Sequence, residues 1–210
     1  MTSYLVFNLG TTSFGEPTMN LSILRKGLIT AAVALLSLNV SAETVRFITN
    51  QGNFEMQLKP EAAPKTVANF LRYVEDGSYK GTLFHRTIPG FMAQGGGYSI
   101  NYEQVATYKP VENESKNGLS NTRGSVAMAR TNDPHSATRQ FFINVIDNGY
   151  LDGSPNKFGY TVFAEISAGM DVVDKIVNKP TKSGPIPGMR NVPMEKVIIE
   201  DVVLVDQAQP

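Results

Sequence analysis

The sequence predicts an all-β fold, either a barrel or a sandwich, and two observations lead to this fold class. Short runs rich in Val, Ile, Thr and Phe recur at close spacing along most of the chain. Two isolated segments, 64–76 and 170–177, instead carry apolar residues at the spacing of a helix face. Many short strands with two separate helices are typical of a closed or layered β-structure.

The N-terminal segment 1–42 contains the three-part pattern of a secretory signal peptide. Arg25 and Lys26 precede the apolar run 27–40, and small residues lead up to Ala42 as they do at a cleavage site. The run is shorter than the about 20 apolar residues that a membrane-spanning helix needs. A membrane anchor and a buried helix are the alternatives.

Met19 stands where such a peptide normally begins, so we expect residues 1–18 to be a misassigned start. Cleavage after Ala42 would leave a single domain, residues 43–210, in the periplasm. We expect this domain to be a monomer that does not bind the membrane after cleavage.

Composition narrows the choice of partner and chemistry. Basic and acidic residues number 19 each, which gives no reason to expect nucleic acid or an anionic membrane surface as a partner. The chain has no Cys, which excludes disulfides, thiolate metal sites and Cys nucleophiles. The two histidines, His85 and His135, lack the spacing of metal ligands. We therefore expect no metal and no cofactor.

The elements of the domain follow in order along the chain. The runs 44–49 and 53–58 flank Asn50-Gln51-Gly52, which predicts a β-hairpin. Pro64 suits the first turn of a helix, and Asp76-Gly77 ends its apolar stripe. Further strands are predicted at 125–129, 141–145, 161–166 and 197–205, a second helix at 170–177, and irregular connections at 98–121 and 178–194.

The stretch 84–96 organises the candidate site. Two apolar runs are joined by Pro89-Gly90, which predicts a tight turn between two strands. Arg86 lies in the first run and Gln94 in the second, so a cation and an amide share an apolar surface. This arrangement predicts a pocket, and an edge strand with one solvated Arg is the alternative. His85 is expected to point to the opposite face from Arg86 and to be structural, not a base.

Three motifs resemble a known family. FHRTIPGFMAQGGG, which begins at Phe84, resembles the signature of the cyclophilin family of peptidyl-prolyl cis-trans isomerases. SVAMAR…RQFFINV and YLDG…FGYTVFAEI resemble that family's other active-site segments, in the same order, and the resemblance extends from Thr44 to about Val205. It implies a closed eight-stranded antiparallel barrel with a helix over each open end. The core of such a barrel is filled, so substrate would bind on its outer surface.

The implied reaction, rotation about an X-Pro bond, suits a site without base, nucleophile or metal. Amide resonance sets a barrier of about 18–20 kcal/mol. Rotation breaks this resonance and returns a lone pair to the prolyl nitrogen. A donor aimed at that nitrogen binds the twisted state better than either planar state, which is transition-state stabilisation.

The resemblance also implies roles for individual residues. Arg86 would donate to the prolyl nitrogen, Gln94 would steady Arg86 and the substrate carbonyl, and Phe91 would belong to the apolar pocket. The substrate-binding positions implied are Met92, Ala129, Arg130, Gln140, Phe142, Tyr150, Leu151 and Tyr160.

Three of these positions depart from the pattern of many relatives. Tyr160 stands where many have His, and Arg130 stands where many have Asn, whose backbone pairs with the residue before proline. Tyr150 replaces the Trp of cyclosporin-sensitive relatives, so we expect at most weak binding of cyclosporin. The expected partners are proline-containing polypeptides that are unfolded or flexible.

Two other classes of function compete with an isomerase. A non-catalytic module could grip proline-containing peptides, but a pure binder would not need Arg86. A scaffold in a larger complex would normally carry extra domains or coiled-coil heptads, and none is visible in the sequence.

Export can be tested on the processed protein. Because the cleavage pattern ends at Ala42, mass spectrometry of the exported protein should find Glu43 at its N-terminus. Recovery of the full-length chain in the membrane fraction would mean that the segment is an anchor.

Overall fold

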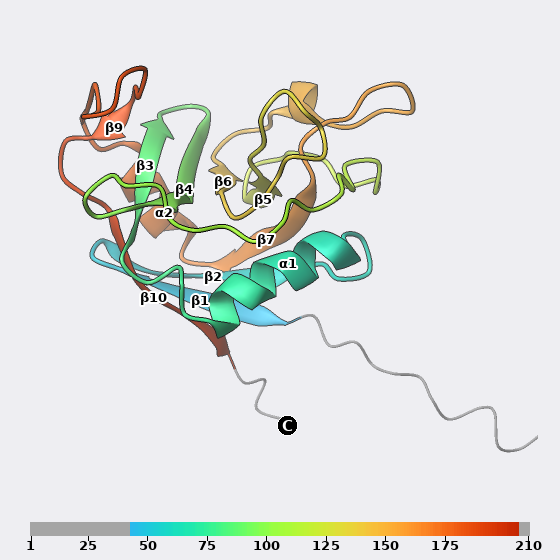
Figure 1. Cartoon of the computed structure of the whole chain (residues 1–210), viewed down its shortest axis with the longest axis horizontal. Helices are drawn as coiled ribbons and strands as arrows, with labels where there is room; N and C mark the ends of the chain where they lie inside the picture. The colour runs from blue at the N-terminus through green and yellow to red at the C-terminus, as the bar shows by residue number, and fades with distance from the viewer. Residues whose placement is uncertain (1–42, 206–210) are drawn as a thin grey trace, which may run out of the picture. The chain divides into compact units, whose positions relative to one another are not determined.

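The computed structural model describes residues 43–205, and the predicted signal peptide lies outside them. Within this range, eight strands form a closed antiparallel barrel in the order β1-β10-β3-β4-β6-β5-β7-β2 (Figure 1). This confirms the predicted barrel. The strands are β1 (Thr44–Thr49), β2 (Gly52–Leu58), β3 (Thr82–Ile88), β4 (Met92–Ser99), β5 (Ser125–Met128), β6 (Phe141–Asn144), β7 (Val162–Ala168) and β10 (Ile198–Val205).

Two helices pack on the barrel at opposite ends of β2. Helix α1 (Pro64–Glu75) begins shortly after Leu58, where β2 ends. Helix α2 (Met170–Val177) lies at the other end, because a Cβ atom on Gly52 would be 3.0 Å from Cγ2 of Val172. Within residues 43–205, neither helix is long and apolar enough to cross a membrane. The helix residues that join the buried barrel core are Val67, Phe70, Tyr73, Val74, Val173, Ile176 and Val177.

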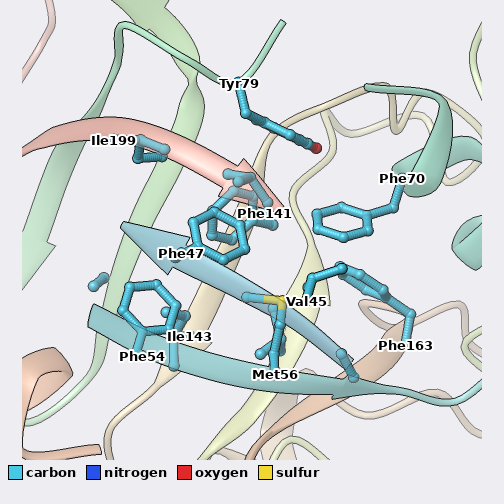
Figure 2. Close-up of a cluster of buried hydrophobic side chains, with 14 of the residues drawn as sticks. Val45, Phe47, Phe54, Met56, Phe70, Tyr79, Phe141, Ile143, Phe163 and Ile199 are labelled. Carbon is cyan, nitrogen blue, oxygen red and sulfur yellow. The ribbon is translucent and has the colours of Figure 1, made fainter. Parts of the chain in front are cut away.

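Aromatic side chains fill the barrel interior (Figure 2). Phe47 and Phe54 stack with their ring centres 4.9 Å apart, and Phe141 meets Phe47 edge-on at 5.3 Å. Phe70 reaches in from α1 and lies 5.1 Å from Phe163 of β7. Burying one such ring contributes about 1.5–3 kcal/mol. The filled interior leaves the outer surface of the barrel for a ligand.

The polar connection 98–121 is anchored to α1. Ala63 provides no side-chain cap for this helix. Glu114 supplies one, because its carboxylate accepts from the backbone N–H of Lys65 at 3.1 Å and of Thr66 at 2.8 Å. A carboxylate at this end also interacts favourably with the helix dipole. The long loop is therefore a structural part of the domain.

The second predicted connection, 178–194, contains a short ladder that sequence analysis missed. Strands β8 (Thr181–Lys182) and β9 (Val192–Pro193) pair antiparallel. The backbone N–H of Thr87 in β3 donates to the carbonyl of Asn191 at 2.9 Å, which holds this segment against the barrel. Its prolines hid the strand signal, because proline disfavours strand interiors and is tolerated at edges.

Arg139 is a buried cation that links three segments. Only 1% of the residue is exposed, and its guanidinium donates to the carbonyls of Gly96, Ala106 and Ser78 at 2.6–2.8 Å. The guanidinium also lies 4.9 Å from the ring centre of Tyr73. These bonds tie β4 to the long loop and to the turn after α1. The sequence pattern alone assigns no role to Arg139.

Replacing Arg139 should destabilise the domain strongly. Arg139→Met keeps much of the apolar stem but removes a buried cation and leaves three carbonyls without their donor, so we expect a loss of about 3 kcal/mol in the free energy of unfolding. Denaturant melts measure this loss. The matched control is Arg72→Met. Arg72 also places its guanidinium over a tyrosine, with Cζ 3.7 Å from the ring centre of Tyr108, but the residue is exposed to solvent. The control should lose under about 1 kcal/mol, and equal losses in both variants would contradict the role given to Arg139.

Candidate active site

The position of Arg86 depends on a β-bulge in β3. Phe84 pairs with Gly95 and Arg86 pairs with Gln94, so β3 advances two residues while β4 advances one, and His85 is the extra residue. Phe84 points into the barrel core. Regular alternation would point Arg86 into the core as well. The bulge reverses the alternation and places Arg86 on the outer face.

Arg86 begins a row of side chains that crosses the outer face of the barrel. Pairing continues from Arg86 to Gln94 in β4, Phe142 in β6, Ala127 in β5 and Val162 in β7. Phe142, Ala127 and Val162 belong to a buried apolar cluster that is separate from the barrel core. Residues paired across strands share a face. The cation, the amide and an apolar surface therefore lie side by side.

Hydrogen bonds fix the orientation of the two polar groups. Nη1 of Arg86 donates to Oε1 of Gln94 at 3.2 Å, and Nε2 of Gln94 donates to Oε1 of Gln140 at 2.9 Å. Partial burial lowers the pKa of Arg86 from its usual value, but a guanidinium remains charged at neutral pH. Within residues 43–205, Arg86 forms no ion pair with a carboxylate. Its remaining N–H groups are available to a ligand.

An apolar pocket of about 180 Å³ opens beside this cation. Met92 and Phe142 form its buried part, with 1% and 5% of each residue exposed. The ring of Tyr160 meets Phe142 edge-on, with ring centres 5.5 Å apart. The pocket brings together nine of the eleven predicted site residues, namely Arg86, Phe91, Met92, Gln94, Ala129, Arg130, Phe142, Leu151 and Tyr160.

The side chain of Arg130 holds the wall of the pocket. Its guanidinium lies 4.7 Å from the ring centre of Tyr160 and donates to the carbonyls of Gly159 and Phe158, both at 3.1 Å. The family resemblance implies a role only for the main chain at this position. The structure adds a stacking contact that orients Tyr160, so two of the three departures from the family pattern, Arg130 and Tyr160, lie in contact with each other.

The other two predicted residues lie outside the pocket. Gln140 lines two neighbouring cavities and contacts the pocket through its hydrogen bond to Gln94. Tyr150 has 65% of its surface exposed and stacks beside Phe91 with ring centres 6.3 Å apart. Tyr150 therefore supports the rim of the pocket from outside.

The expectation that His85 and Arg86 face opposite ways is wrong. Both residues line a polar groove of about 520 Å³ next to the pocket, because the bulge disrupts the alternation at this point. The ring of His85 meets Tyr98 edge-on at 4.7 Å. Burial lowers the pKa of His85 to about 4, so the imidazole is neutral at pH 7 and is a poor base.

Glycines next to Gln94 allow close packing around the site. Gly96 has φ of +82°, and a Cβ atom there would lie 2.8 Å from the ring of Tyr79. A Cβ atom on Gly97 would lie 2.4 Å from Cδ of Gln140. Gly96 and Gly97 therefore serve close approach of neighbouring groups, and Gly96 also adopts a positive φ. Gln140 can reach Gln94 because Gly97 has no side chain.

Comparison with known proteins decides the family. The sequence model described as "Cyclophilin type peptidyl-prolyl cis-trans isomerase/CLD" matches residues 44–204. The chain belongs to the cyclophilin family. The predictions of the family and of an isomerase are thereby confirmed.

Cyclophilin relatives and structures agree with this assignment. The chain is 48% identical to a peptidyl-prolyl cis-trans isomerase of Acinetobacter baylyi, over 86% of this chain and 95% of the relative. It is 52% identical to peptidyl-prolyl cis-trans isomerase B of Escherichia coli, over 76% of this chain and 98% of the relative. A cyclophilin-type isomerase of Cryptosporidium parvum, whose structure was determined in the presence of the dipeptide Ala-Pro, matches with a TM-score of 0.63 and 30% identity, over 77% of this chain and 98% of the other.

Proposed function

We propose that this cyclophilin accelerates rotation about X-Pro bonds in exported proteins that are still folding, and that Arg86 stabilises the twisted amide. The observation that carries the proposal is the placement of one oriented, half-buried guanidinium at the edge of an apolar pocket. The pocket would hold the proline ring, and the guanidinium would meet the nitrogen of the same ring.

The mechanism needs a donor that strengthens its bond only as the amide twists. In the planar amide the nitrogen lone pair is delocalised and accepts hydrogen bonds poorly. In the twisted state the lone pair is localised, so an N–H of Arg86 gains a full acceptor. Gln94 holds Arg86 in place before substrate binds, which avoids reorganisation in the transition state. No bond to the substrate is made and no proton is transferred.

The apolar wall would fix the ring while the preceding residue rotates. Met92, Phe142 and Tyr160 form the apolar wall of the pocket. Within residues 43–205, its only charged lining residues are Arg86 and Arg130, which lie at the rim. The Cryptosporidium parvum relative was crystallised in the presence of Ala-Pro, which supports a proline-containing peptide as the ligand of this pocket. Tyr150 offers no indole N–H, so we propose that cyclosporin binds weakly.

The N-terminal pattern supports the proposed compartment. The signal-like segment 1–42 supports export to the periplasm, where unfolded polypeptides arrive and X-Pro isomerisation takes tens to hundreds of seconds without catalysis. The absence of Cys from the chain is compatible with an oxidising compartment.

Removing Arg86 should reduce the rate far more than it reduces binding. For Arg86→Ala we expect a catalytic efficiency about 10²–10³-fold lower, the scale for loss of one preorganised donor. Arg86→Lys should recover only part of the rate, because one ammonium cannot reproduce the fixed fork of donors. Exchange NMR on an X-Pro peptide measures the rates, and denaturant melts should show a stability change under about 1 kcal/mol.

Phe142→Ala serves as the comparison variant. It removes the pocket wall, so it should weaken peptide affinity and lower stability by about 3 kcal/mol. If Arg86→Ala stays folded and isomerises the peptide at the wild-type rate, the electrostatic mechanism is wrong. The pocket would then act by shape alone.

A further inference from the structure

The polar groove of about 520 Å³ next to the proline pocket is not used by the mechanism above. It lies between the barrel and residues 186–191 of the β8–β9 connection. Arg86 and Gln94 line both the pocket and the groove. A peptide whose proline occupies the pocket can therefore continue directly into the groove.

The outer wall of the groove has a defined position. The N–H of Thr87 donates to the carbonyl of Asn191 at 2.9 Å, which places Arg190 one residue from a backbone bond to β3. The loop is closed by a second backbone bond, from Gly184 to the carbonyl of Met189 at 2.9 Å. Arg190 therefore directly precedes the residue that is bonded to Thr87, the neighbour of Arg86 in the chain.

The groove is positively charged and has no internal counter-ion. Arg86 and Arg190 both line it, and no Asp or Glu is among its lining residues. Within residues 43–205, neither arginine takes part in an ion pair. His85 also lines the groove but is neutral at pH 7 because burial lowers its pKa to about 4. Two unpaired guanidinium groups favour an anion, and carboxylates match their fork of donors.

We propose that this groove binds an acidic side chain of the substrate, located within three residues of the isomerised proline, and that Arg190 selects for it. The inference rests on the proposed function, since it assumes that the proline occupies the neighbouring pocket. Each extended residue advances by about 3.3–3.6 Å, and the groove has more room than the pocket. The groove can hold several residues beside the proline.

Matched peptides test this selectivity. Residues 43–210 are assayed by exchange NMR with peptides that contain one proline among alanines. Each peptide carries Glu, Gln or Lys at one position, and the substituted position is scanned over three residues on each side of the proline. At low ionic strength, the Glu peptide should have a higher kcat/KM than the Lys peptide at one of these positions. We expect the ratio of the two kcat/KM values to be about 2 to 5, the range for an exposed ion pair. The ratio should fall toward one as salt is added, because salt screens exposed charges.

Charge reversal at Arg190 identifies the residue responsible. Arg190→Glu should invert the Glu-to-Lys ratio at the same position. The control Lys80→Glu makes the same change of charge on an exposed side chain that lines none of these cavities, and it should keep the wild-type ratio. A ratio near one at all six positions, or an equal shift in both variants, would overturn the inference. A protein that isomerises none of the peptides would overturn the proposed function instead.

Discussion

The bulge at His85 is the constraint on which the candidate site depends. Phe84 must face inward, because its ring packs in the barrel core 5.8 Å from that of Phe141. Thr87 also faces inward, since it pairs with Ala93 of the core. The two positions are three residues apart in the sequence, an odd number, so regular alternation cannot point both inward. The extra residue resolves the conflict and turns Arg86 outward.

The rest of the site follows from strand pairing around this point. Once Arg86 faces outward, the register places Gln94 and Phe142 beside it on neighbouring strands. Gln140 then bonds to Gln94 across the space left by Gly97, and buried Arg139 next to it is bonded to Gly96. Each functional side chain is therefore held by strands or by buried hydrogen bonds. A rigid site of this kind suits a reaction that depends on the orientation of one donor.

The sequence predicted most of the fold and the composition of the pocket, but not the local features that orient it. Periodicity and turn residues located both helices and the barrel strands, because burial imposes a period on the sequence. The resemblance supplied barrel closure and residue roles. The bulge was missed because one extra residue leaves no mark in the pattern around His85. The contacts of Arg139 and Arg130 were missed because their partners are backbone groups or lie far away in the sequence, and local residue preferences carry no information about such contacts.

The most direct test of the account varies the prolyl nitrogen and leaves the enzyme unchanged. Two peptides are compared that differ only in carrying proline or 4,4-difluoroproline, since fluorine withdraws electrons and makes the nitrogen a weaker acceptor. If Arg86 donates to this nitrogen, the ratio of catalysed to uncatalysed rate should be lower for the fluorinated peptide. The Arg86→Ala variant should show the same ratio for both peptides, which controls for the fit of the ring. An equal ratio for both peptides with the wild-type protein would contradict the account.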